Sequence, residues 1–435
     1  MTRSARFEPA GSLRGRYAPP ADKSISHRAA LFGSMCDEPV RVRNYLESAD
    51  TRSTLDAVQT LGAGVEEEGA GRLLVRGVGL HAPLEATGGL LNVGNAGTLM
   101  RLLPGWLAGV PGGVWTLDGD ESIRRRPVDR IAEPLRAMGA RVVVRDGRFP
   151  PFTVTGASLT GIDYELPVPS AQVKSCVLIA GMLAAGSTSV TEGSMSRDHT
   201  ERILRRARAP FTSDGLRATV SSVDELELDE IVVPGDPSSA AFIAAAAVLV
   251  PGSRVVMSGV GLNWTRTAFF RIAQRMGAVV LGDLEEPWVQ PDHEPVGELD
   301  VASGALEGTV VEPEEVPLAI DELTLVALLG ANAEGETVVR GAQELRLKES
   351  DRLAGVVAGL RAIGAQIEST GDGFVVCGDG SPLRGGRLDS LGDHRLAMLG
   401  AVAGLASREG VEVVGIDAAA VSYPGFEADV RSLTG

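Results

Sequence analysis

The chain has 435 residues, of which 44% are hydrophobic, 4% are aromatic and 54 are glycine, and its formal net charge is −16. This length is enough for two or three hydrophobic cores, and the composition is that of a globular chain and not of a disordered one. The acidic balance argues against a nucleic-acid-binding surface, because contact with phosphate backbones needs a dominant basic face.

One pattern recurs six times along the chain: a small polar cluster leads into a short segment rich in Ala, Leu and Val. We predict a buried helix in each segment, because its residues are apolar on nearly every face. The predicted buried helices are 25–35, 99–110, 173–185, 240–250, 323–331 and 396–406. The intervals between clusters are 74, 73, 67, 83 and 73 residues, counted from Ser24, Thr98, Ala171, Ser238, Asp321 and His394. A recurrence this regular indicates one supersecondary unit copied six times.

A second, amphipathic set of predicted helices alternates with the first. Most of them end in glycine, as a left-handed C-cap requires, and run into a short strand. They cover 55–63, 131–140, 203–210, 269–278, 353–365 and 426–435. Both series keep the same interval, so we predict an α/β protein of six β-α-β-α-β-β units. Two joints, 17–20 and 232–236, are the expected domain crossings, which puts three units in residues 20–234 and three in residues 1–19 plus 235–435.

The cysteines and the apolar segments indicate the cellular compartment in which the protein is expected to act. Cys36, Cys176 and Cys377 lack the spacing of a metal site or a disulfide framework, as is typical of a reducing compartment. The longest apolar run, 240–250, is too short to cross a bilayer, and the N-terminal residues lack the apolar core of a signal peptide. We therefore expect a cytoplasmic protein that binds neither a membrane nor a metal.

The first polar cluster, 22–28, puts two basic side chains on the first turns of a predicted buried helix. Lys23 and Arg28 lie near i,i+4 spacing, with the hydroxyl of Ser24 between them. Charge and helix dipole together can hold a phosphate at such a place. A capped helix with a solvated lysine and arginine fits the same residues about equally well.

Two further segments of the N-terminal half, 94–101 and 123–127, are candidates for contact with an anion. Gly97 opens a helix where bare backbone N–H groups can approach a ligand, although such loops often only turn the chain. Arg126 ends a run of three arginines, a pattern that is usually a solvated patch. Because Pro127 is expected to open the next helix, Arg126 would lie at the start of that helix.

Three later clusters have both a chemical and a purely structural interpretation. Ser170 and Gln172 place neutral hydrogen-bonding groups at a helix start, which suits hydroxyl ligands, but an ordinary N-cap serine gives the same pattern. Arg197 lies in a segment charged with both signs, as an amphipathic helix start also is. Asp321 and Glu322 set two carboxylates at the threshold of an apolar helix, which suits acid–base chemistry.

The last charged clusters lie close to the fifth and sixth repeats. Lys348 and Arg352 are four residues apart, on one face of an expected helix, with Glu349 beside them; a salt-bridged helix start is the alternative. Arg395 stands at the start of the sixth apolar helix. No single cluster is decisive, but most of them coincide with repeat junctions, and this favours the functional interpretation. The junction 235–239 looks mainly architectural.

At these residues the chain closely resembles the 3-phosphoshikimate 1-carboxyvinyltransferase family, also called the EPSP synthases. The resemblance runs nearly end to end through DKSISHR (22–28), GNAGT (94–98), RP (126–127), SAQVKS (170–175), SRDHTE (196–201), GDPSSA (235–240), LKESDR (347–352) and DHR (393–395). It implies a two-domain inside-out α/β barrel with three repeat units per domain, which closes over its substrates. It also implies transfer of the enolpyruvyl group of phosphoenolpyruvate to the 5-hydroxyl of shikimate 3-phosphate, with release of phosphate and without a metal or organic cofactor.

The resemblance also implies roles for single residues. Asp321 matches the family's proton acceptor at the attacking hydroxyl, Glu349 matches the residue proposed to handle the methylene proton, and Lys23 is expected to be catalytic with them. The residues that match the shikimate 3-phosphate site are Lys23, Ser24, Arg28, Ser170, Ala171, Gln172, Arg197, Asp321 and Lys348. Those that match the phosphoenolpyruvate site are Lys23, Gly97, Arg126, Gln172, Arg352 and Arg395.

Two alternatives stay open. The sister enolpyruvyl transferase acting on UDP-N-acetylglucosamine shares the fold and an Arg-Pro-Val-Asp motif like 126–129, but it generally has a loop cysteine just before it, and 118–125 has none. A non-catalytic phosphosugar-binding protein on the same scaffold would be expected to lose Lys23, Asp321 or Glu349, and all three are present. We therefore expect a member of the EPSP synthase family, which the resemblance implies to be a monomeric enzyme of aromatic amino acid biosynthesis and a target of glyphosate.

Overall fold

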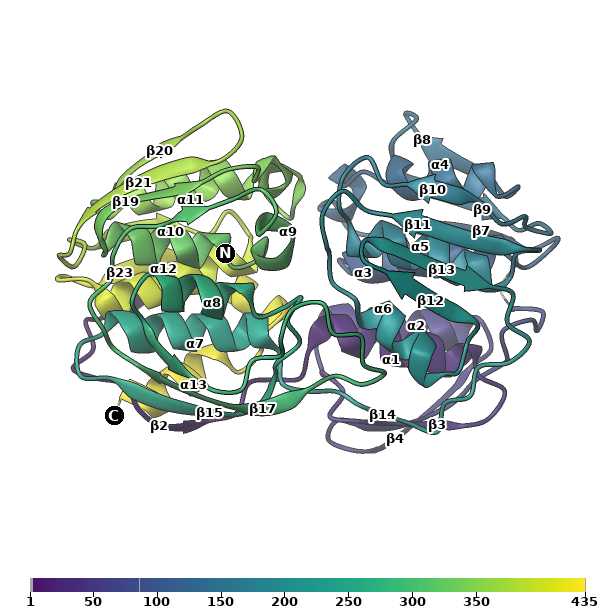
Figure 1. The fold of residues 1–435 in the computed structure, drawn as a ribbon, viewed down its shortest axis with the longest axis horizontal. Coiled ribbons are helices and arrows are strands. Elements are labelled where there is room, and N and C mark those ends of the chain that lie inside the picture. Colours follow the sequence, from purple (N-terminus) through teal and green to yellow (C-terminus); the bar gives the residue numbers. More distant parts are fainter. Residues whose placement is uncertain (1–2, 86, 435) are drawn as a thin grey trace. The chain divides into compact units, whose positions relative to one another are not determined.

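The apolar segments form six helices in the structure, a computed structural model that describes residues 3–85 and 87–434 (Figure 1). They are α1 (Lys23–Met35), α3 (Gly97–Ala108), α5 (Ala171–Met182), α7 (Pro237–Leu249), α10 (Leu323–Ala331) and α12 (His394–Ala406). Nearly all of their residues are buried, which confirms the prediction. Each helix is apolar all round because it is covered on several sides: α7, α10 and α12 contact one another, and α3 contacts both α1 and α5.

The amphipathic series is also confirmed. It comprises α2 (Ala49–Thr60), α4 (Asp129–Ala137), α6 (His199–Arg206), α8 (Ala268–Arg275), α11 (Arg352–Ala362) and α13 (Phe426–Thr434); the last residue of the helix predicted over 426–435 lies outside the described residues. Four of these helices end in a glycine with positive φ, as expected of a left-handed C-cap: Gly62, Gly139, Gly277 and Gly364. The shorter helical elements are η1 (Ile123–Arg125), α9 (Val316–Ala319), η2 (Gln343–Leu347) and η3 (Ile416–Val421).

The described strands form six separate sheets, five of four strands and one of three. Three of them are β14-β3-β5-β4, β6-β7-β9-β8 and β10-β11-β13-β12, and the others are β16-β17-β15-β2, β18-β19-β21-β20 and β1-β23-β22. Every four-stranded sheet has one parallel pair followed by two antiparallel pairs, and none of the sheets built from described residues closes on itself. The strands are β1 (Ser4–Phe7), β2 (Arg14–Tyr17), β3 (Val40–Arg43), β4 (Gly64–Gly69), β5 (Arg72–Arg76), β6 (Leu90–Asn92), β7 (Val114–Asp118), β8 (Arg141–Arg145), β9 (Phe149–Thr155), β10 (Asp163–Glu165), β11 (Ser187–Thr191), β12 (Phe211–Asp214), β13 (Arg217–Ser221), β14 (Glu230–Val232), β15 (Arg254–Gly261), β16 (Val279–Leu281), β17 (Val296–Ala302), β18 (Val310–Val311), β19 (Glu334–Val339), β20 (Gln366–Ser369), β21 (Phe374–Asp379), β22 (Gly386–Asp389) and β23 (Val411–Val414).

The chain divides into two units, each with its own hydrophobic core. Unit 1 consists of residues 1–20, 234–287 and 295–435, and unit 2 of residues 21–233 and 288–294. Two strands explain the joints at 20 and 233. The N-terminal β2 pairs in parallel with β15 of unit 1, and β14 turns back to pair in parallel with β3 of unit 2.

One segment departs from the predicted boundaries. Residues 288–294 connect β16 to β17, and the sequence assigned them to the C-terminal domain, but they group with unit 2. Polar contacts with α6 explain this: Nδ1 of His199 lies 2.6 Å from Oε1 of Glu294, and Nη1 of Arg202 donates to the carbonyl of His293 at 2.9 Å. Hydrophobic periodicity cannot reveal the partners of such a polar loop. No helix among the described residues has both the length and the apolar character to cross a membrane.

Candidate active site

Unit 2 places the predicted residues of its half at the starts of α1, α3 and α5. Asp22 caps α1 by accepting the N–H of Ile25 at 2.9 Å, and this sets Lys23 and Ser24 on its first turn. Nζ of Lys23 forms an ion pair with Oδ2 of Asp50 at 2.9 Å, and the lysine side chain remains 21% exposed. Its ammonium is therefore oriented but still accessible to a ligand.

Arg28 is buried, and its hydrogen bonds within the described chain all go to neutral oxygens. Nε donates to Oγ1 of Thr200 at 2.8 Å, Nη2 to Oγ of Ser175 at 2.9 Å, and Nη1 to the carbonyl of Ser24 at 3.1 Å. Burial lowers the pKa of Arg28 to about 10, and the nearby cation of Arg197 acts in the same direction. A buried cation held by neutral groups is stabilised by a bound anion.

Helix α5 links Arg28 to the glycine-rich start of α3. Ser170 caps α5, as the structural alternative for this segment has it, and Ala171 and Gln172 form the first turn of the helix. The amide of Gln172 bridges to α3: its Nε2 donates to Oγ1 of Thr98 at 3.2 Å, and its Oε1 accepts from Nη1 of Arg101 at 3.0 Å. The amide is thus fixed in orientation.

The start of α3 lies against Arg126. Helix α3 has no side-chain N-cap, but the N–H of Gly97 itself donates to the carbonyl of Asn95 at 2.9 Å. Nη2 of Arg126 donates to Oδ1 of Asn95 at 2.8 Å and to Oγ of Ser122 at 3.1 Å. Helix α4 begins at Asp129, not at Pro127 as predicted, so Arg126 belongs to the turn after η1.

A buried ion cluster lies behind this half of the site. Nζ of Lys174, on α5, lies 2.5 Å from Oε2 of Glu192 and 2.7 Å from Oε1 of Glu201, and all three side chains are almost fully buried. Burial alone would lower the pKa of Lys174, but the two carboxylates raise it above its usual value. Burial raises the pKa of Glu201, and the carboxylate of Glu201 in turn acts to raise the pKa of Arg28, against the effect of burial on that guanidinium.

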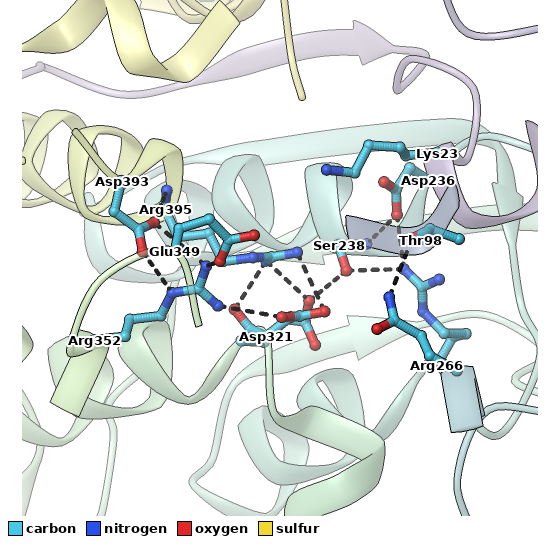
Figure 2. Close-up of polar contacts among 12 residues, drawn as sticks. Lys23, Thr98, Asp236, Ser238, Arg266, Asp321, Glu349, Arg352, Asp393 and Arg395 are labelled. Atoms are coloured by element: carbon cyan, nitrogen blue, oxygen red, sulfur yellow. Dashed lines mark hydrogen bonds and ion pairs between the residues drawn. The ribbon is translucent and has the colours of Figure 1, made fainter. Parts of the chain in front are cut away.

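In unit 1 four of the predicted residues, Asp321, Glu349, Arg352 and Arg395, form one connected network (Figure 2). Arg352 is at its centre: Nε donates to Oδ2 of Asp393 at 2.9 Å, Nη1 to Oδ1 of Asp321 at 3.2 Å, and Nη2 to Glu349. Burial would lower the pKa of Arg352, but these three carboxylates raise it. Asp351 caps α11 and starts the helix at Arg352, so Lys348 precedes the helix and the predicted shared helical face is wrong.

Arg395 joins the same network from the first turn of α12. Its Nη1 donates to the carbonyl of Asp321 at 2.8 Å and to Oε1 of Glu322 at 3.3 Å, and Nη2 lies 3.5 Å from Oδ2 of Asp321. The carboxylate of Asp321 therefore lies between two arginines. The two arginines fix the orientation of this carboxylate, and a proton acceptor needs such positioning.

The junction 235–239, which the sequence marks as mainly architectural, is hydrogen-bonded to this network. Ser238 donates to Glu322, and Arg266 contacts both Asp236 and Ser238, so this junction continues the network of Arg395. The sequence pattern offered no sign of Arg266, which lies between β15 and α8, away from every repeat junction.

Other partners in unit 2 were also missed. Asp50, Asn95, Arg101 and Thr200 orient predicted site residues, but they come from other helices and turns, and local spacing does not connect them. No group of three or more His, Cys, Asp or Glu side chains within residues 3–85 and 87–434 is arranged to hold a metal ion.

Comparison with solved structures gives the class of the fold. The chain superposes on EPSP synthase from Acinetobacter baumannii with a TM-score of 0.86 at 37% sequence identity, covering 100% of this chain and 98% of the other. It also superposes on the enolpyruvyl transferase NikO from Streptomyces tendae with a TM-score of 0.75 at 17% identity, a likeness of fold alone. The fold is thus a mixed α/β fold shared with enolpyruvyl transferases.

Sequence comparison gives the family. The model of EPSP synthase (3-phosphoshikimate 1-carboxyvinyltransferase) matches residues 7–430. Proteins named 3-phosphoshikimate 1-carboxyvinyltransferase from Acidithiobacillus ferrooxidans and Thermus thermophilus are each 45% identical, over 421 and 430 residues, and the matches cover 97% and 98% of this chain and 95% and 98% of those proteins. The chain belongs to the EPSP synthase family and is a transferase.

Proposed function

We propose that this chain transfers the enolpyruvyl group of phosphoenolpyruvate to the 5-hydroxyl of shikimate 3-phosphate and releases phosphate, as a step of the shikimate pathway. The observation that carries the proposal is the family match over residues 7–430, which includes every motif that supplies a candidate site residue. The geometry within each unit supports distinct roles for the two halves.

The groups of unit 2 suit the binding of anionic substrates. Arg28 is a buried cation with neutral partners, and Arg197 adds a second positive charge near it. With Ser24, Ser170, Ala171 and Gln172 they would hold shikimate 3-phosphate. Lys23, Gly97, Arg126 and Gln172 would hold phosphoenolpyruvate, whose carboxylate and phosphate need cations and free N–H donors.

The groups of unit 1 suit proton transfer. Adding an alcohol to an enol ether requires that the hydroxyl lose a proton while the methylene carbon gains one. Asp321, fixed between two arginines, would accept the hydroxyl proton, and Glu349, with Lys23, would handle the methylene proton. Arg352 and Arg395 would bind phosphoenolpyruvate, and Lys348 would bind shikimate 3-phosphate.

The finer features of the family are part of the same proposal. We infer a monomeric, cytoplasmic enzyme without a cofactor, whose two three-repeat domains form an inside-out α/β barrel. Residues 20–234 would form one domain and residues 1–19 plus 235–435 the other, apart from the segment 288–294. Glyphosate is expected to inhibit it at the phosphoenolpyruvate site.

One assay tests the reaction and separates it from its nearest alternative. Phosphate release from phosphoenolpyruvate is measured with the purified chain and either shikimate 3-phosphate or UDP-N-acetylglucosamine as the acceptor. We expect turnover with shikimate 3-phosphate only. Turnover with the nucleotide sugar alone would assign the chain to the sister activity, and turnover with neither would favour a binding protein.

A further inference from the structure

A second set of polar groups, all of them buried, supports the site residues of unit 1. Arg395 contacts one partly exposed carboxylate, Asp321, whose side chain is 15% exposed, and one buried carboxylate, Glu322, which is 2% exposed. Arg352 is supported in the same way by Asp393, which is 0% exposed. The proposed function gives a role to the partly exposed carboxylate, Asp321, and none to the buried carboxylate, Glu322.

Glu322 is one member of a line of hydrogen bonds that ends at Arg395. Its Oε1 accepts from Nη1 of Arg395 at 3.3 Å and also from the hydroxyl of Ser238. Nη2 of Arg266 donates to Oγ of Ser238 at 2.8 Å and to Oδ1 of Asp236 at 2.9 Å. These side chains are all at least nine-tenths buried, so each is held by its neighbours and not by solvent.

The second oxygen of Glu322 gives independent evidence for a function. Oε2 is buried and has no hydrogen-bond partner among the described residues. A buried carboxylate oxygen left unsatisfied lowers stability, and such a group in a native protein needs an explanation. Glu322 does not use its side chain to cap α10 either. Among the described residues, its side chain forms hydrogen bonds with Ser238 and Arg395.

We propose that Glu322 is a positioning residue for the transfer reaction, which it affects by fixing the guanidinium of Arg395. Ser238 and Arg266 hold the carboxylate of Glu322 in turn. This inference rests on the proposed function, because it takes Arg395 as a ligand of phosphoenolpyruvate. In this role Glu322 contacts no reacting atom. Glu322 binds Arg395 from the buried side, and Asp321, the other carboxylate that Arg395 contacts, would face the substrates.

Steady-state kinetics of four variants test the proposal. Glu322→Ala is expected to lower kcat/KM for phosphoenolpyruvate by roughly 30-fold, with KM for shikimate 3-phosphate within about twofold, because only the positioning of Arg395 is lost. Glu322→Gln keeps an acceptor oxygen and should recover all but about threefold. Ser238→Ala removes one hydroxyl, leaves the core packing intact and should show a smaller effect in the same direction. Thr324→Val, two residues further along the chain in α10, removes a buried hydroxyl without a partner among the described residues and serves as the matched control.

A double-mutant cycle distinguishes positioning from a general structural role. If Glu322 acts through Arg395, then Glu322→Ala combined with Arg395→Lys should be no worse than Arg395→Lys alone, within about twofold. Multiplicative losses, or lower melting temperatures with unchanged kinetic constants in Glu322→Ala and Ser238→Ala, would overturn the proposal. Turnover by the unmodified chain tests the proposed function separately. Whichever acceptor supports turnover, the double-mutant cycle is measured as kcat/KM for phosphoenolpyruvate.

Discussion

Replacing Gly97 by alanine tests the phosphoenolpyruvate half of the site by a single methyl group. An ideal Cβ at Gly97 lies 2.7 Å from Nη1 of Arg126 and 3.3 Å from Nη1 of Arg101. Comfortable contacts begin near 3.5 Å, so the Arg126 guanidinium must move by roughly 0.8 Å. Gly97 has no positive φ and opens a helix, so the backbone accepts alanine, and the perturbation falls on that side chain.

The shift separates Arg126 from the groups that orient it. Its Nη2 is held by Asn95 and Ser122, and a movement of this size breaks or tilts both hydrogen bonds. Misplacing a binding group by about 1 Å can cost roughly 100-fold in rate. For Gly97→Ala, whose shift is smaller, we expect KM for phosphoenolpyruvate to rise by about 10-fold, with KM for shikimate 3-phosphate within about twofold.

The assay is initial-rate phosphate release with phosphoenolpyruvate varied at saturating shikimate 3-phosphate, without and with glyphosate. Glyphosate should compete with phosphoenolpyruvate, and its inhibition constant should rise in the variant by at least the same factor. Gly11→Ala is the matched control, because a Cβ there meets no atom within 4 Å and φ is not positive. An unchanged KM in Gly97→Ala would remove Arg126 from the phosphoenolpyruvate site.

Three further predictions concern other parts of the two units. Asp321→Asn should keep its affinity for shikimate 3-phosphate in a calorimetric titration while kcat falls by at least ~100-fold, the scale of losing a general base; near-normal turnover would exclude Asp321 from proton transfer. Lys174→Met leaves two buried glutamates without their cation and should lower the free energy of unfolding in urea by roughly 3–5 kcal/mol, whereas a loss below about 1 kcal/mol would mean that the cluster is already neutralised. Burial lowers the pKa of His27 to about 3, from 6.5 in the unfolded chain. Because only the unfolded chain then gains a proton below pH 6.5, this residue's contribution to stability is complete above that pH and is lost as the pH falls towards 3. The unfolding free energy should therefore drop by roughly 1.4 kcal/mol per pH unit in the wild type, and His27→Gln should lack this part of the slope; equal slopes between pH 6 and pH 5 would contradict the assignment.

The helices were the most predictable part of the fold, because their signals are local. The apolar segment of α7 and the glycine that ends each of α2, α4, α8 and α11 can be recognised within a dozen residues of sequence. The same holds for the capping residues Asp22 and Ser170, which start the helices that carry Lys23 and Gln172.

What the sequence could not supply are contacts between distant segments. Arg28 is oriented by Thr200, 172 residues away, and Glu322 by Ser238, 84 residues away. The side of a helix that faces such a partner depends on packing between helices, which periodicity does not specify. The segment 288–294 was misassigned for the same reason, since its contacts with α6 are polar.

The pairing of strands far apart in the chain has a consequence for synthesis. Strand β2 is completed by β15, whose first residue is 254, and β1 by β23, whose first residue is 411. Until these residues leave the ribosome, the N-terminal segment presents sheet edges with unbonded N–H and C=O groups. Once β14 has been made, unit 2 lacks only residues 288–294. Its core can therefore assemble while β1 and β2 are still without their partner strands. During this interval the nascent chain needs protection against edge-to-edge association.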